Sequence, residues 1–263
     1  MAKPNFIELD DGQEIQRIPI LYEDRSALAV DKPPAWMLVP FSWQNTNRNL
    51  MAALTSSISA GDFWARSRGL KFLRNVHRLD ADTTGILLFC KSMGAVEPFT
   101  DLFETRNMDK IYLAVVTGVP KQKEWMCELP LASDPRQIGK MRVDHQEGKA
   151  AETHFRVLQT RDAPGGPLTL VEARPVTGRT HQIRLHLAEA GTPVTGDKLY
   201  GLNAAPVGPT YSDGRPKRRP GRSEPPPPLG LRSIYLSYLD PFQKRRVQIN
   251  APTEGFLKQF GFE

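Results

Sequence analysis

Residues 75–90 read Asn75-Val-His-Arg-Leu-Asp-Ala-Asp-Thr-Thr-Gly-Ile-Leu-Leu-Phe-Cys90. The apolar run that ends at Cys90 follows a Thr-Thr-Gly turn sequence, which predicts a buried strand. A carboxylate beside the start of a buried strand costs free energy unless it is paired or used, so Asp80 is a candidate reactive group. The alternative interpretation is a turn in which Asp80 or Asp82 accepts hydrogen bonds from backbone amides, and on composition alone this is the commoner outcome.

The segment upstream of Asp80 is basic. Five basic residues and no acidic one lie between Arg66 and Arg78. In the functional interpretation these residues form the rim of a cleft with Asp80 at its floor, and the rim attracts a polyanion.

The rest of the chain alternates irregularly between strand and helix patterns. Two apolar runs separated by polar residues predict a hairpin over 18–36, and helical spacing predicts helices over 50–58, 92–106 and 180–190. Ser92 is placed to cap the second of these helices, and Gly191 ends the third. Further strands are expected over 110–118, 150–158 and 168–173, the first with Tyr112 on one face. This order predicts an α+β fold with a mixed sheet and flanking helices.

Length and composition exclude several classes of protein. The chain has 263 residues with 40% hydrophobic ones, which is enough for a folded core. Cys90 and Cys127 form neither a disulfide framework nor a metal-binding pair, which favours a reducing, cytoplasmic location. Because no basic leader or long apolar run is visible, secretion and membrane insertion are not expected.

Residues 204–228 differ from the rest. They contain eight prolines and three glycines in 25 residues, without hydrophobic periodicity, which predicts a mobile insertion within one domain. The insertion carries five basic and two acidic residues, so +3 of the net charge of +6 lies there. It is either a docking element for a polyanion or, as general experience with surface loops slightly favours, a tolerated loop.

A second motif reads Gly178-Arg-Thr-His-Gln-Ile-Arg-Leu-His186. On the predicted helix His181 and Arg184 share a face. His181 and His186 diverge by more than a right angle, which makes them poor ligands of one metal, so zinc is rejected. Arg184 either lies in solvent or reaches a buried carboxylate and holds it ionised, and both interpretations remain open.

Together these motifs closely resemble the RluA-type family of RNA pseudouridine synthases. The resemblance rests on His77-Arg-Leu-Asp80, Lys110-Ile-Tyr112 and the Gly178–His186 motif, and it extends from about residue 18 to about residue 242. Three further blocks agree in order: Asp31-Lys-Pro33, residues 139–153 and residues 191–201. A single short motif would be weak evidence, but several in one order are strong.

The resemblance implies a mechanism and a site. Asp80 attacks the target uridine, the bond to N1 breaks, the base rotates and a bond from C1′ to C5 forms, with no cofactor and no metal. Tyr112 stacks on the base and is implicated in removing the C5 proton, and Arg184 is the basic partner of Asp80. Arg78 helps to hold the flipped-out nucleotide, since an extruded uridine needs an aromatic face and a cation. The remaining residues expected to bind RNA are His77, Arg74, Arg179 and His181.

The resemblance also implies a domain layout. Residues 1–17 form an N-terminal extension, 18–250 the catalytic domain with an active-site cleft across a largely antiparallel sheet, and 251–263 a C-terminal tail, without an S4-type RNA-binding domain. The expected protein is a cytoplasmic monomer that acts on ribosomal or transfer RNA, and the sequence leaves the RNA open.

Two alternatives use the same residues differently. A hydrolase would use Asp80 and Arg184 to cleave a nucleoside bond and release free base. A non-catalytic RNA-binding factor would use only the basic surface, and it is disfavoured because a binding module has no use for Asp80, Tyr112 and Arg184 together.

Overall fold

A mixed sheet forms the centre of the computed structural model, which describes residues 3–10, 14–38, 48–201, 211–212, 215–216 and 227–262. Eleven of the described strands belong to it, in the order β1-β2-β3-β5-β14-β6-β11-β10-β7, with β15 paired to β14 and β4 to β5. Their bounds are β1 Phe6–Asp10, β2 Ile15–Glu23, β3 Ala27–Lys32, β4 Arg74–Asn75, β5 Thr84–Cys90, β6 Met108–Thr117, β7 Glu124–Cys127, β10 Thr153–Arg161, β11 Leu168–Pro175, β14 Leu231–Leu239 and β15 Arg246–Asn250. The described pairings are antiparallel except that of β5 with β14, so the mixed, largely antiparallel sheet is confirmed.

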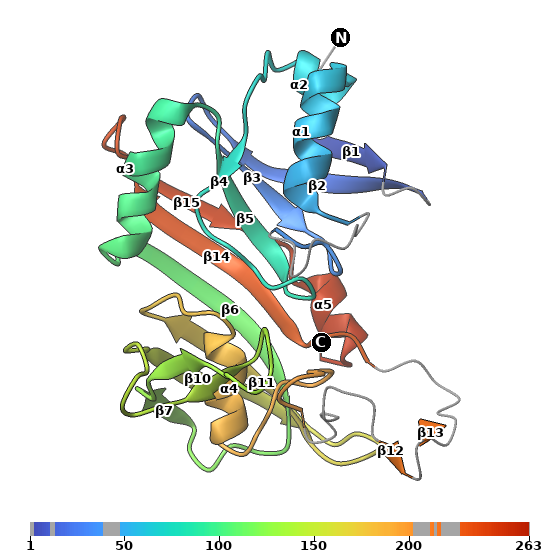
Figure 1. The fold of residues 1–263 in the computed structure, drawn as a ribbon, viewed down its shortest axis with the longest axis vertical. Helices are drawn as coiled ribbons and strands as arrows, with labels where there is room; N and C mark the ends of the chain where they lie inside the picture. The colour runs from blue at the N-terminus through green and yellow to red at the C-terminus, as the bar shows by residue number, and fades with distance from the viewer. Residues whose placement is uncertain are drawn as a thin grey trace.

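Helices cover both faces of this sheet (Figure 1). Strand β5 shows why: Leu87 and Phe89 point into one apolar cluster, while Ile86 and Leu88 point into another. On the first face lie α1 Leu50–Ala60, α2 Phe63–Arg66 and α4 Gln182–Glu189; on the second lie α3 Met93–Glu104 and α5 Glu254–Gln259. A strand that is buried on both faces has no polar alternation, which is why the run before Cys90 is continuously apolar.

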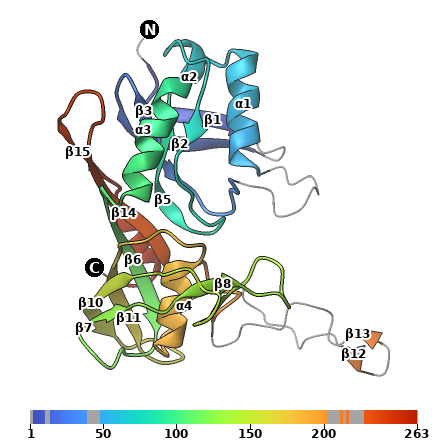
Figure 2. The ribbon, with the colours of Figure 1, turned by 60° about the vertical axis from the view of Figure 1, so that its left-hand side comes forward.

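The sheet joins two halves of the molecule (Figure 2). Strands β1 to β5 with helices α1 to α3 form one half, and β7, β10 and β11 with α4 form the other. Strands β14 and β6 lie between them in the sheet order. The loop before β5 and the loop before α4 therefore face each other across the middle of the sheet.

Most of the predicted elements are confirmed, with shifted ends. The predicted hairpin corresponds to β2 and β3, and Tyr112, Ala114 and Val116 point to one face of β6. The third helix begins at Gln182 and not at Thr180, because His181 adopts a left-handed conformation with φ of 56°. Ser92 is the N-cap residue of α3, but its side chain makes no capping hydrogen bond.

The two ends of the described chain join the core. Ile7 and Leu9 of β1 are buried, although the sequence pattern places them in an N-terminal extension. Phe256, Phe260 and Phe262, in the segment expected to be a tail, pack against the face of β6 that carries Leu113 and Val115. Both segments are too short to show a clear period, and only the sheet provides the surface that buries them.

Other parts of the chain are short hairpins. Strands β8 Leu131–Ser133 and β9 Met141–Val143 form one, and β12 Tyr211–Ser212 and β13 Arg215–Pro216 form another. The proline-rich insertion 204–228 otherwise lies outside the described residues, apart from its last two prolines. No helix in the part of the chain that the structure describes is long and apolar enough to span a membrane.

Gly85 fixes the junction of β5 and β14. Its φ is +103°, and a Cβ atom there would lie 2.0 Å from the carbonyl oxygen of Ser233. We expect Gly85→Ala to lower the free energy of unfolding by about 2–4 kcal/mol, since it combines backbone strain with overpacking. Chemical denaturation measures this change. The control is Gly69→Ala, where φ is +62° but no atom lies within 4 Å of the added Cβ. An equal loss in both variants would contradict the prediction.

Candidate active site

Asp80 lies in the loop between β4 and β5, and among the described residues its carboxylate contacts side chains. The Arg184 guanidinium donates from Nη1 to Oδ2 at 2.9 Å, and His181 Nε2 lies 3.7 Å from Oδ1. The carboxylate is largely covered, with 17% of its side chain exposed. Asp80 therefore faces a cation across the sheet, and the turn-capping interpretation is wrong for this residue.

The buried side chain of Lys32 holds the loop that carries Asp80. Its Nζ donates to the carbonyl oxygens of Ala81 at 2.6 Å, Thr83 at 3.0 Å and Pro33 at 3.0 Å. All three donors of an ammonium group are thereby used, which is the condition under which a lysine is tolerated in a core. Lys32 thus ties the end of β3 to the loop that presents Asp80.

Lys32→Met removes this support. We expect a decrease of about 2–4 kcal/mol in the free energy of unfolding, because buried carbonyl oxygens lose their donor. The loop should also open more readily, which hydrogen exchange of the amides near Asp80 would detect. Lys258→Met, on an exposed position of α5, is the matched control and should change stability by less than about 0.5 kcal/mol. Equal stability of the two variants would exclude this role for Lys32.

Arg184 is buried and bridges two carboxylates. Its Nε and Nη2 donate to Asp197 Oδ2 and Oδ1 at 2.7 and 2.8 Å, while Nη1 reaches Asp80. Burial opposes the charge of Arg184, but its bonds to Asp197 and the field of Asp80 outweigh it and raise its pKa. Burial likewise disfavours the Asp197 carboxylate, yet the Arg184 hydrogen bond keeps its pKa below the usual value. The buried interpretation of Arg184 is thereby confirmed.

His181 stands at the N-terminus of α4, and the preceding loop fixes it there. Gln182 accepts from the Arg179 amide and the Thr177 hydroxyl, and it donates to the carbonyl oxygen of Glu152. His181 thus leaves the helical path and turns toward Asp80. By contrast, the ring nitrogens of His186 are hydrogen-bonded to the Thr153 hydroxyl and the Leu129 carbonyl oxygen. The predicted divergence of the two histidines is therefore confirmed.

Tyr112 forms the inner wall of the site. It is 9% exposed and sits on β6, on the face that also carries Lys110. Burial raises the pKa of Tyr112 to about 12, so the side chain is a neutral phenol at neutral pH. It therefore offers an aromatic face and a hydroxyl group, and it acts as a base only after losing its own proton.

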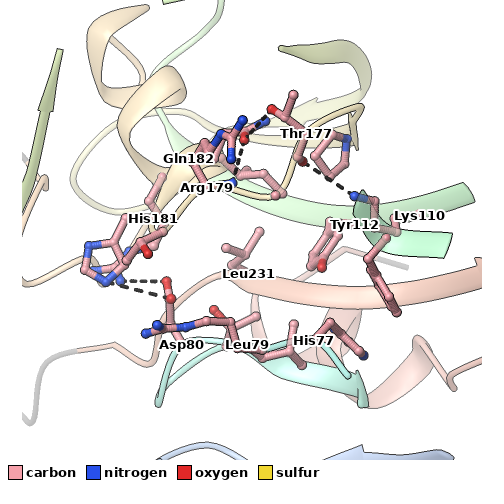
Figure 3. A pocket seen from close by; sticks show the side chains of 18 of the residues that line it. His77, Leu79, Asp80, Lys110, Tyr112, Thr177, Arg179, His181, Gln182 and Leu231 are labelled. Carbon is pink, nitrogen blue, oxygen red and sulfur yellow. Dashed lines mark hydrogen bonds and ion pairs between the residues drawn. The ribbon is translucent and has the colours of Figure 1, made fainter. Parts of the chain in front are cut away.

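A pocket of about 540 Å³ connects these residues. Figure 3 shows Asp80 and His181 at one end, Lys110 at the other, and Tyr112 with Leu231 between them. This volume is in the range of pockets that hold small ligands. Four basic side chains besides Arg184 line it, from both halves of the molecule: Arg78, Arg106, Lys110 and Arg179. The pocket thus combines a carboxylate, an aromatic wall and a cationic border.

The other residues predicted to bind RNA are placed unequally. Arg78 and Arg179 line the pocket with His77, whereas Arg74 does not. His77 Nε2 accepts from the Leu88 amide at 3.0 Å, and burial lowers its pKa to about 3, so the ring is neutral. Any contact of His77 with a ligand is therefore that of a neutral ring.

The basic run from Arg66 to Arg78 does not form the rim as expected. Arg68 is buried and donates to Glu23 at 2.9 Å, and Arg66 belongs to the short helix α2. Of the five basic residues counted in this run, only Arg78 lines the pocket. The rest of the pocket's positive charge comes from segments distant in sequence, which a local count of charges does not reveal.

Four site residues were not singled out from the sequence: Lys32, Arg106, Asp197 and Tyr200. Lys32 lies within the quoted Asp31-Lys-Pro33 block, and Asp197 and Tyr200 lie within the block 191–201. A lysine at the end of a largely apolar strand was the available signal for Lys32. Arg106, in a left-handed conformation after α3, had none.

This chain resembles known proteins in sequence and in fold. A family model described as RNA pseudouridylate synthase matches residues 29–189, a segment that contains Asp80, Tyr112 and Arg184. The chain belongs to this family. That membership confirms the resemblance based on the sequence motifs.

Individual relatives agree with the family. An uncharacterized RNA pseudouridine synthase, YhcT, of Bacillus subtilis is 33% identical over 202 residues, which are 74% of this chain and 64% of that protein. The ribosomal large subunit pseudouridine synthase D of Nitrosomonas europaea is 34% identical over 198 residues, 74% of this chain and 53% of that protein. The chain therefore spans less than two thirds of the length of these two curated relatives.

The solved structures show the same fold. The human RNA pseudouridylate synthase domain containing 1 matches with a TM-score of 0.63 and 25% identity, over 89% of this chain and 83% of that chain. The α+β fold of the pseudouridylate synthases is thereby confirmed for this member.

Proposed function

We propose that the protein converts uridine in RNA to pseudouridine, with Asp80 as nucleophile and without a cofactor. The observation that carries the proposal is the placement of Asp80. Its carboxylate is held by Arg184 at 2.9 Å at the end of a pocket whose wall is Tyr112. A carboxylate is ionised at neutral pH and needs no base for activation, which suits attack on a nucleoside.

The proposed reaction balances without an added reagent. Asp80 forms a bond to the uridine, the bond between C1′ and N1 breaks, the base turns and C5 bonds to C1′. The bond to Asp80 breaks again before the product leaves, C5 loses a proton and N1 gains one. Arg184 orients Asp80, and the face of Tyr112 replaces the stacking that uridine loses when it leaves the RNA. The proposed role of Tyr112 in removing the C5 proton requires prior loss of its phenolic proton.

The pocket border supports an RNA substrate. Arg78, Arg106, Lys110 and Arg179 place positive charge along the pocket lining, and RNA is recognised largely through its phosphates and its unstacked bases. We propose Arg78, Arg179, His77 and His181 as RNA contacts within the pocket and Arg74 as a contact outside it. One chain supplies all of these residues, which fits a monomer. The free cysteines Cys90 and Cys127 fit a cytoplasmic location.

The product decides between isomerisation and hydrolysis. Ribosomal and transfer RNA transcripts are incubated with the protein, digested to nucleosides and analysed by liquid chromatography and mass spectrometry. We expect a new nucleoside that has the mass of uridine and resists cleavage to base and sugar. Release of free uracil would instead establish the hydrolase, and binding without any product would establish the RNA-binding factor.

Arg78→Gln tests the proposed contact of the pocket border with RNA. We expect weaker binding, with the slope of log affinity against log salt smaller by about one, because one phosphate contact is lost. Fluorescence anisotropy with labelled RNA, measured at several salt concentrations, gives this slope. Arg74→Gln is the matched comparison, and its effect should be smaller because Arg74 does not line the pocket. An unchanged slope for Arg78→Gln would refute the contact.

A further inference from the structure

Two hydrogen bonds connect the β8–β9 hairpin through Tyr200 to His181, whose ring faces Asp80. The Met141 amide donates to the Tyr200 hydroxyl oxygen at 2.8 Å, and this hydroxyl lies 2.9 Å from His181 Nδ1. The other ring nitrogen of His181, Nε2, lies 3.7 Å from Asp80 Oδ1. Within the described residues no hydrogen bond joins Tyr200 to Asp80, and the Tyr200 hydroxyl reaches that carboxylate through His181.

The donors in this line, together with the Asp80 carboxylate beside Nε2, favour one position for the proton of His181. Since the Met141 amide can only donate, the Tyr200 oxygen accepts from it, and the Tyr200 hydroxyl proton is free to point at His181. Nδ1 of His181 then accepts, which leaves the ring proton of the neutral imidazole on Nε2. That N–H group faces Asp80 Oδ1.

Tyr200 also supports the second partner of Asp80. Its ring lies 5.3 Å from the Arg184 guanidinium carbon, and its backbone amide donates to Asp197 at 3.0 Å. The ring of His181 meets that of Tyr200 edge to face, with centroids 5.6 Å apart. With 9% exposure, Tyr200 is shielded from water, so little solvent is available to replace its hydroxyl.

We propose that Tyr200 is a positioning residue for the nucleophile: its hydroxyl fixes the tautomer of His181, which in turn orients the Asp80 carboxylate. Arg184 then holds Oδ2 at 2.9 Å, while Oδ1 faces a neutral N–H at a longer distance. The catalytic part of this inference rests on the proposed function. The tautomer itself does not.

The tautomer can be measured without any RNA. The nitrogen chemical shifts of the His181 ring, in the nitrogen-labelled full-length protein, report which ring nitrogen carries the proton, and His181→Gln assigns the signals. We expect Nε2 to be protonated in the wild type and a mixture of tautomers in Tyr200→Phe. Tyr22→Phe, which removes a hydroxyl bonded to Asp24 outside the site, is the control and should leave His181 unchanged. If Tyr200→Phe had the same tautomer populations as the wild type, the proposal would be overturned.

Kinetics test the consequence for Asp80. The substrates are large-subunit ribosomal RNA and transfer RNA transcripts carrying uridine tritiated at C5, which release tritium when C5 bonds to C1′. We expect Tyr200→Phe to lower kcat by roughly tenfold or more, since small misplacements of a reacting group are costly, with KM changed by less than about twofold, since Tyr200 itself does not line the pocket. The effects of Tyr200→Phe and His181→Gln should be far from additive in the double variant, because both act along one path. Additive effects would overturn the coupling.

The pH profile separates positioning from a general loss of structure. His181 is surrounded by Asp80, Asp197, Arg184, Arg78 and Tyr200. Burial lowers the pKa of His181 in the wild type, and an unoccupied Nδ1 would raise it again, because the imidazolium needs a proton there. The acidic limb of kcat should therefore lie at a higher pH in Tyr200→Phe, where a protonated His181 pairs with Asp80. A uniform decrease at every pH would overturn the proposal.

If wild-type protein makes no pseudouridine in either RNA, the proposed function fails, while the tautomer measurement still stands.

Discussion

Asp80→Asn is expected to abolish pseudouridine formation while leaving the protein folded. The amide has almost the same shape as the carboxylate, but it lacks the anionic oxygen that we propose attacks the uridine. Arg184 keeps its two bonds to Asp197 in this variant, so no buried charge is left alone. The expected decrease is at least about 10³-fold, in line with the loss of a covalent nucleophile. Tritium release measures activity, and thermal unfolding measures the fold.

Asp82→Asn is the matched control for Asp80→Asn. Asp82 lies two residues further along the same loop, is 43% exposed and lies 3.5 Å from Lys198. The Asp82→Asn variant should keep the wild-type activity within about threefold, because an exposed ion pair contributes little. RNA binding should survive in both variants. Turnover by Asp80→Asn at the wild-type rate would remove Asp80 from the mechanism and with it the proposed function.

Arg184→Met is expected to remove both activity and a large part of the stability. Asp197, whose side chain is fully buried, would keep its charge without its partner. Breaking a buried pair in this way costs about 3–5 kcal/mol, measured as the change in the free energy of unfolding. Asp80 would also lose the donor that orients it, so activity should decrease by roughly 10²-fold or more.

A second variant separates these two effects of Arg184. In Arg184→Met with Asp197→Asn the buried charge is removed, while the amide oxygen still accepts from the Leu199 and Tyr200 amides. We expect part of the stability to return and activity to remain lost. Arg17→Met, which breaks an exposed pair with Glu8, is the control and should change stability by less than about 1 kcal/mol. Recovery of activity in the double variant would show that Arg184 acts only on the fold.

Local sequence signals determined most of the fold. The apolar run before Cys90, the alternation around Tyr112 and the polar break in the first hairpin correspond to β5, β6 and the β2–β3 pair. These signals depend on a period of two or on the burial of both faces, which a short window of sequence records. The two ends have no such period, and their place became clear only in the sheet: β1 is one of its strands and α5 packs against it.

The sequence by itself determined the family and singled out Asp80, Tyr112 and Arg184 as candidate site residues, because they lie in motifs whose order along the chain is informative. The tertiary structure alone decided how the three are held. Lys32 reaches the Asp80 loop, and Arg184 reaches Asp80 across 104 positions of sequence. Such contacts join segments with no local relation to each other, and a hydrogen bond depends on distance and direction in space, which sequence spacing does not specify.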